Sequence, residues 1–239
     1  MSGHSKWSTI KHKKAKEDSK RGKAFTKLIK EITVVARDGG GDPDANARLR
    51  LLMEKAKEIN MPQENTMRAI KKGTGELPGA QYERYVYEGY GPYGIAVIVD
   101  VLTDNKNRSA AEMRRLFSSH GGSLGETGSV AWMFTTLGVV RVASATTTEE
   151  QLLDMLIEFT IQEIEQNDDG TISIFCDPKE LYNVKRTLEK EGVVVETAQL
   201  ENVSKSTLSL PDDQTEKAYS FLESLNDHDD VQNVSTTLE

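Results

Sequence analysis

The stretch "GTGELPG", residues 73–79, divides the chain into two parts with different patterns. Its glycines and proline are typical of a break between elements of secondary structure. Before it, apolar residues recur at helical spacing. After it, buried-strand patterns such as "GIAVIVDVLT" (94–103) alternate with helical ones. The sequence therefore predicts an α+β, multidomain protein that begins with a helical domain.

The helical part is expected to hold three amphipathic helices in a small bundle. The first follows residue 23 and ends at the glycines 39–41. The second begins at Asp42, with Pro43 as its first helical residue, and the third runs from Pro62 to Gly73.

Beyond the break, short links between strands and helices favour two small α+β sandwiches over one doubly wound sheet. Strands are expected at 129–136 and 207–210, among others, and a further unit begins at 138. The expected domains are 1–77 (basic arm and helical bundle), 78–136 plus 204–239 (a split α+β domain) and 137–203 (an inserted α+β domain).

Composition excludes several classes of protein. The longest apolar run, residues 95–99, is far too short to span a membrane, and no apolar segment of a signal peptide follows Met1. Cys176 is the single cysteine, which excludes a disulfide framework and a cysteine-rich zinc site, and we expect it to fill space in a strand. A cytoplasmic protein without a membrane partner is expected.

Two glycine-rich stretches invite a phosphate-binding interpretation. "GYGPYG" (89–94) matches Gly-x-Gly-x-x-Gly, but a strand follows where a dinucleotide fold needs a helix, and Pro92 lacks an N–H donor. A β-turn is the better interpretation. "HGGSLGETGSV" (120–130) lacks the Gly-Lys-Ser/Thr of a P-loop. It is interpreted as a helix-to-strand loop, with a phosphate nest or a contact with RNA or a partner as the alternatives.

The titratable residues fix no catalytic site. Asp100, Asp104, Glu112 and His120 share a region without a common spacing, and the four histidines show no metal-ligand pattern. We expect no enzyme activity, catalytic residue, cofactor, metal or small-molecule substrate. The acidic runs "EQNDDG" (165–170) and "NDHDD" (226–230) are interpreted as solvated surface or helix ends that repel nucleic acid.

The charge distribution is the strongest functional signal. Residues 1–30 carry ten Lys or Arg and two acids, a net of +8, whereas the whole chain is −8 and the other 209 residues therefore sum to −16. A solvated tail is the plain interpretation. The concentration of charge and the aromatic Trp7 among the cations favour binding to duplex DNA or ribosomal RNA instead. The expected nucleic-acid-binding residues are Lys6, Trp7, Lys11, Lys13, Lys14, Lys16, Lys20, Arg21, Lys23, Lys27 and Lys30.

Two points about this basic cluster stay open in the sequence. Trp7 either stacks on bases or, together with Ile10, docks the arm on the bundle. No Arg/Asn pair lies on an obvious recognition helix, so the sequence does not separate DNA from RNA.

Several motifs closely resemble the YebC family, also called YebC/PmpR. They are "GHSKWSTIKHKKAKEDSKRGKAFTKLIKEI", "GGGDPDANARLR", "NMPQENTMRAIKKG", "YEGYGPYGIAVIVDVLTDNKNR" and "GGSLGETGSVAWMF", all within the first 134 residues. The resemblance implies a helical domain and two α+β domains, the last one inserted within the middle one, and no catalytic residues.

The resemblance also implies two functions. Bacterial members of the family are described as probable transcriptional regulators that bind promoter DNA. A mitochondrial relative is a translational activator of cytochrome c oxidase subunit I, and bacterial members are placed on the ribosome, easing stalls at proline-rich stretches. The hypothesis is a DNA-binding transcriptional regulator. The alternative is a ribosome-associated translation factor.

Overall fold

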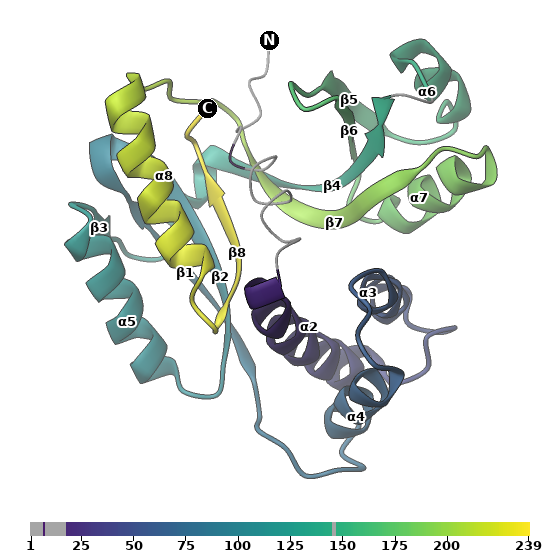
Figure 1. Ribbon diagram of the computed structural model, residues 1–239, viewed down its shortest axis with the longest axis horizontal. Helices are drawn as coiled ribbons and strands as arrows, with labels where there is room; N and C mark the ends of the chain where they lie inside the picture. The colour runs from purple at the N-terminus through teal and green to yellow at the C-terminus, as the bar shows by residue number, and fades with distance from the viewer. Residues whose placement is uncertain (1–6, 8–17, 145–146) are drawn as a thin grey trace. The chain divides into compact units, whose positions relative to one another are not determined.

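The computed structural model describes residue 7, residues 18–144 and residues 147–239, with the backbone alone for residues 18–21. These residues divide into two compact units, 1–133 with 204–239 and 134–203 (Figure 1). The first unit contains a helical part and an α+β part. No helix among the described residues is long and apolar enough to cross a membrane.

The helical part consists of α2 (Asp18–Gly39), α3 (Ala47–Glu58) and α4 (Gln63–Gly73). Their inward faces share one apolar core. Gly73 at the end of α4 lies so close to α2 that a Cβ there would come within 2.3 Å of the Thr33 carbonyl oxygen. The core contains Leu28, Ile32, Val35, Ala36, Leu49, Leu52, Ala56, Met61, Ala69 and Ile70.

The second helix begins later than the sequence predicts. Asp42 and Pro43 lie in a turn, and α3 starts after Asn46, whose side chain accepts a hydrogen bond from Leu49 N at 3.1 Å. Asn46 also donates to the carbonyls of Val35 and Gly40. The side chain of Asn46 both caps α3 and bonds to the end of α2. These contacts favour a helix start at Asn46 over the start predicted at Asp42.

The α+β part of this unit has one antiparallel sheet in the order β3-β1-β2-β8. Its elements are β1 (Glu83–Tyr90), β2 (Ala96–Thr103), α5 (Lys106–Ser119), β3 (Ser123–Leu124), α8 (Asp212–Asn226) and β8 (Val231–Thr236). The turn η1 (Pro92–Gly94) joins β1 to β2, so "GYGPYG" is the predicted connection between two strands.

Helices α5 and α8 lie side by side on one face of this sheet (Figure 1). The rings of Phe117 on α5 and Phe221 on α8 meet edge to face, 5.0 Å apart between centroids. Both residues belong to a core that also includes alternate residues of β2, from Val97 to Val101. The sheet and the two helices on it therefore join residues 83–124 to residues 212–236 near the C-terminus.

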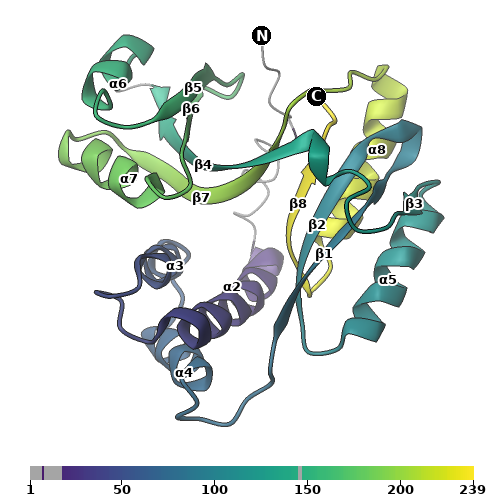
Figure 2. The same cartoon turned by 180° about the vertical axis from the view of Figure 1, so that it is seen from behind.

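The unit 134–203 is a second α+β sandwich (Figure 2), with sheet order β5-β6-β4-β7. Its elements are β4 (Phe134–Ala143), α6 (Glu149–Met155), β5 (Ile161–Gln166), β6 (Thr171–Cys176), α7 (Leu181–Lys190) and β7 (Val195–Ser204). Cys176 is fully buried, and burial raises the pKa of its thiol to about 12, as suits a residue that only fills space.

Two predicted strands differ from the structure. The expected strand 129–136 is replaced by η2 (Ala131–Met133) and the start of β4, which continues through Gly138 to Ala143. Gly138 does not end the strand, because it pairs with Cys176 of β6, and a Cβ at 138 would come within 2.8 Å of Cys176 Sγ. Residues 207–210 form only an isolated bridge, Leu208 to Leu238. The predicted α+β class, with a helical domain before two sandwiches, is confirmed.

Candidate nucleic-acid interface

The basic segment is described only from its later part. Lys20 and Arg21 lie on α2, where the backbone alone is described. Five further lysines precede α2 in the sequence and lie outside the described residues: Lys6, Lys11, Lys13, Lys14 and Lys16. Their contact with nucleic acid stays a prediction.

The three later lysines of the segment contact the end of α8. Lys23, Lys27 and Lys30 follow one another at helical spacing on α2. Lys23 Nζ donates to the Asp227 carbonyl at 3.0 Å and Lys27 Nζ to the Asn226 carbonyl at 2.5 Å. A helix C-terminus carries carbonyls without intrahelical partners and a partial negative charge, so lysines stabilise it.

Lys30 has a different role from the expected phosphate contact. Its side chain is buried, and its Nζ donates to the Asp229 carbonyl at 3.0 Å and to Asp230 Oδ1 at 2.6 Å. A buried ammonium held by two such acceptors is not available to a phosphate. The same helical face that looks basic in the sequence is therefore the face by which α2 binds the α+β part.

Trp7 is also placed differently from the base-stacking expectation. Its indole is 3% exposed, its Nε1 donates to the Val234 carbonyl at 3.3 Å, and its ring stacks on Tyr219 with centroids 6.2 Å apart. Docking, the second interpretation, fits these contacts. The surface is that of α8 and β8, however, and not the helical bundle.

Asp230 connects the elements that meet at Lys30. Its Oδ2 accepts hydrogen bonds from Thr103 at 3.0 Å, Arg108 at 3.0 Å and Ser109 at 2.8 Å. Burial would raise the pKa of Asp230, but the bonds from Lys30, Arg108 and Ser109 outweigh it and hold the pKa well below its ordinary range. The interpretation of "NDHDD" as solvated is therefore wrong at Asp230, which is 4% exposed, although Asp227 and Asp229 are exposed.

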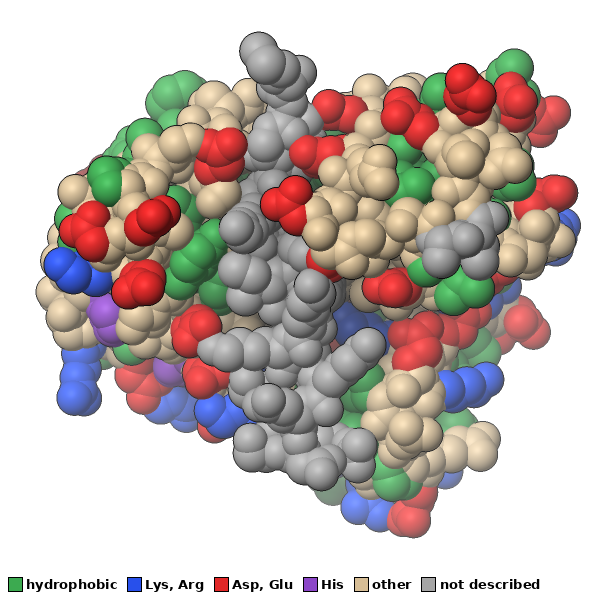
Figure 3. All heavy atoms as spheres, turned by 45° about the horizontal axis from the view of Figure 1, so that its top comes forward, with side chains coloured by type: hydrophobic (Ala, Val, Ile, Leu, Met, Phe, Trp, Pro, Cys, Tyr) green, Lys and Arg blue, Asp and Glu red, His purple; other side chains and the backbone are tan. Residues whose placement is uncertain are grey.

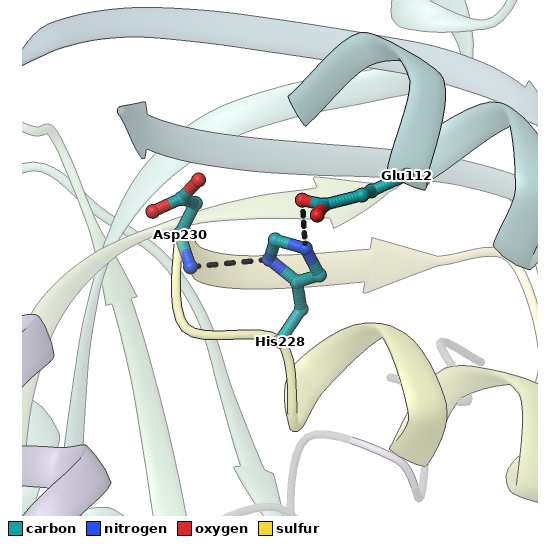
Figure 4. A group of neighbouring side chains, drawn as sticks. All are labelled: Glu112, His228 and Asp230. Atoms are coloured by element: carbon teal, nitrogen blue, oxygen red, sulfur yellow. Dashed lines mark hydrogen bonds and ion pairs between the residues drawn. The ribbon is translucent and has the colours of Figure 1, made fainter. Parts of the chain in front are cut away.

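One group among the described residues has the spacing of metal ligands: Glu112, His228 and Asp230 (Figure 4). Both ring nitrogens of His228 are in use, since Nδ1 accepts from Asp230 N at 3.1 Å and Nε2 donates to Glu112 Oε2 at 2.9 Å. Lys30 and Arg108 also bring positive charge to the Asp230 carboxylate. The arrangement is suited to a hydrogen-bonded junction rather than to a cation.

The glycine-rich stretch after α5 forms a nest, but the nest holds a carboxylate of the same chain. Glu88 on β1 is 5% exposed, and its carboxylate accepts from Gly128 N at 2.8 Å, Val130 N at 2.9 Å and Ala131 N at 2.8 Å. Burial would raise the pKa of Glu88, but the three N–H donors together lower it. These donors are therefore occupied by Glu88 and not free for a phosphate.

The rest of the chain, residues 31–239, has no net positive charge, since it sums to −16. Residues 31–77 contain eight Lys or Arg and eight Asp or Glu, and unit 134–203 carries five against fourteen, a net of −9. In the upper part of the face drawn in Figure 3, the charged side chains are mostly acidic. The excess of positive charge in this chain therefore lies in the basic segment, residues 1–30.

Two family models together match almost the whole chain. Residues 5–76 match the TACO1/YebC protein N-terminal domain, and residues 82–238 match the TACO1/YebC second and third domain. The chain belongs to the TACO1/YebC family. The gap between the two matched regions, residues 77–81, overlaps the break at residues 73–79.

Two full-length relatives of this TACO1/YebC chain carry the same description. Proteins named "probable transcriptional regulatory protein" from Persephonella marina and Chloroherpeton thalassium are each 50% identical over all of this chain and 96% of their own length. The crystal structure of a conserved hypothetical protein from Aquifex aeolicus aligns with a TM-score of 0.86 and 44% identity, over 94% of this chain and 93% of that one.

The buried ion pair predicts a large effect of Asp230→Asn. Removing one partner of a buried pair leaves the other charge uncompensated, so the free energy of unfolding should fall by about 3 kcal/mol, measured by urea denaturation at pH 7. The exposed neighbour gives a matched control, because Asp229→Asn removes the same charge without losing the Lys30 contact.

The same pair gives a pH dependence. Because the folded-state pKa of Asp230 is lowered, its contribution to stability is present above the unfolded value of about 3.9 and is lost as the pH falls below it. The stability difference between wild type and Asp230→Asn should therefore shrink between about pH 5 and pH 2. Equal stability of the two proteins at pH 7 would contradict the role given to Asp230.

Proposed function

We propose that the protein is a non-enzymatic, nucleic-acid-binding regulator of gene expression, and specifically a DNA-binding transcriptional regulator of the YebC type. The observation that carries the proposal is the division of the basic segment. Lys23, Lys27 and Lys30 serve the fold, while residues 1–21 hold seven further Lys or Arg against two acids, a net of +5. A concentrated cluster of cations is suited to phosphates.

Contact with the phosphate backbone supplies affinity without reading sequence. Each cation that neutralises a duplex phosphate releases about one counterion, which makes binding steeply salt-dependent. The relatives' name supports DNA as the target. The acidic unit 134–203 opposes a broad contact with the duplex and helps to confine it to the segment.

The non-enzymatic part of the proposal rests on the contacts of the titratable residues near β2 and α5. Asp104 pairs with Arg108 at 3.0 Å, Glu112 bonds His228, and His120 Nδ1 contacts the Leu116 carbonyl at 2.9 Å. Each side chain is occupied by a separate local partner. General acid–base catalysis needs two such groups directed at one site.

Changing Lys11, Lys13, Lys14 and Lys16 together to Ala should weaken binding to a fluorescent 30-base-pair duplex. If all four contact phosphates, the log-log salt slope should become shallower by about 3 to 4, because each lost contact removes close to one unit. Fluorescence anisotropy at several salt concentrations measures both the affinity and the slope.

The matched control changes four exposed lysines elsewhere, Lys57, Lys179, Lys190 and Lys217, to Ala. It alters the net charge by the same amount and should leave the slope nearly unchanged. Equal weakening by both variants would mean that net charge alone governs binding. If only the protein with the four changes at residues 11–16 shows a large fall in melting temperature, these lysines stabilise the fold.

The second candidate function is a ribosome-associated translation factor that eases stalls at proline-rich stretches. One observation favours it: the acidic body, residues 31–239 with a net charge of −16, tolerates little contact with bare duplex. Both candidates use the same arm.

Sucrose-gradient sedimentation of a DNase-treated lysate separates the two functions. A translation factor should migrate with ribosomal particles at low salt, and a chain without residues 8–17 should lose that migration while keeping Trp7 and α2. Migration at the top of the gradient for both chains excludes the ribosome and leaves promoter DNA as the target.

A further inference from the structure

The loop that Glu88 organises presents an exposed tryptophan. Trp132, in η2, is 66% exposed. The preceding residues of the loop are fixed by the Glu88 carboxylate, and Gly125 N adds a bond to the Glu88 carbonyl at 2.8 Å. Trp132 therefore lies on a short segment whose backbone N–H groups donate to Glu88 of β1. These hydrogen bonds fix the position of Trp132 on the surface.

The indole is itself held in one orientation. Its Nε1 donates to the Ser129 carbonyl at 3.2 Å, within the same loop. The Trp132 carbonyl accepts from Lys205 Nζ at 2.8 Å, and Lys205 N donates to the Met133 carbonyl at 2.8 Å. With its single hydrogen-bond donor satisfied, the indole offers a ligand its aromatic surface alone.

The neighbouring residues of β1 extend the apolar surface beside the loop. Side chains alternate along a strand, so Val86 and Tyr90 lie on the same face as Glu88, two residues to either side. They are 46% and 39% exposed. The intervening Tyr87 packs on the core under α5 and α8. The outward face of the sheet therefore carries aromatic and aliphatic groups around the loop.

A cation contacts the backbone of Trp132. Lys205 is exposed, and its ammonium has three donors, of which the Trp132 carbonyl takes one. An aromatic face next to a free ammonium donor is the combination by which proteins bind single strands, with a base on the ring and its phosphate on the cation. Glu126, an exposed acid in the same loop, limits this attraction and disfavours a dense duplex backbone.

We propose that Trp132 is a stacking site for an unpaired nucleobase of a single-stranded nucleic acid, with Lys205 on the adjacent phosphate and Glu88 as the residue that positions the loop. The site rests on the proposed nucleic-acid-binding function and deepens it. The basic segment attracts the backbone, and Trp132 then distinguishes unpaired from paired bases, because a paired base is already stacked within its duplex.

The two tryptophans of the chain make the site directly observable. In a Trp7→Phe protein, all tryptophan emission comes from Trp132. Titration with 15-nucleotide oligo-U and oligo-dT should quench this emission as they bind, and a 15-base-pair duplex should bind without quenching. Comparison of the two oligonucleotides shows whether the strand is RNA or DNA.

Substitutions then connect the signal to affinity. In the otherwise wild-type chain, Trp132→Ala should weaken oligonucleotide binding on the order of tenfold with an unchanged salt slope, whereas Trp132→Phe should retain most of the affinity. Ile157→Ala, which shortens an even more exposed apolar side chain, should have no effect. Because Trp132 is exposed, its loss should leave the melting temperature nearly unchanged.

Glu88 is tested in the Trp7→Phe background. Glu88→Gln should reduce the quenching at saturation with oligonucleotide and leave duplex affinity unchanged. A residue with only a structural role would lower the melting temperature without altering the quenching at saturation.

Three outcomes overturn the inference. Oligonucleotide binding without quenching, together with wild-type affinity of Trp132→Ala, places binding on the basic segment alone. Equal quenching by duplex removes the preference for unpaired bases. Binding of neither oligonucleotide nor duplex at low salt by the full chain overturns the proposed function as well.

Discussion

The first unit depends on the buried ion pair between Lys30 and Asp230. The two residues are 200 positions apart, yet their atoms are 2.6 Å apart. Asp230 also accepts from Thr103 at the end of β2 and from Ser109 on α5, so one carboxylate meets three elements. Leaving either charge of such a pair alone would be costly. The middle of α2 is therefore held at the point where α8 passes into β8.

This constraint divides the basic segment into two parts. From Lys23 onward, lysines serve as caps for α8, where the partial charge of the helix end favours them. Trp7 adds a second attachment, at Tyr219 and the Val234 carbonyl.

The sequence predicts those features that repeat locally. Ile32 and Leu49 lie on helical apolar faces, and glycine ends α2 where expected. The contacts of Asp230 and Glu88 are not predictable in this way, because the partners of both carboxylates lie far from them in the sequence. Only the fold brings Lys30 to one and three backbone N–H groups to the other. Alternation along β1 does place Glu88 on the outward face of the sheet. That position predicts a solvent-exposed side chain, whereas Glu88 is buried.

Selective acetylation of lysines, read by mass spectrometry, tests the division of the basic segment most directly. We expect Lys30 to resist acetylation in the free protein and Lys11, Lys13, Lys14 and Lys16 to react. When the protein is saturated with duplex DNA or with ribosomal particles, those four lysines should become protected, and the partner that protects them is the target. Rapid acetylation of Lys30 in the free protein, or unchanged acetylation of the four arm lysines with both partners, would contradict the account.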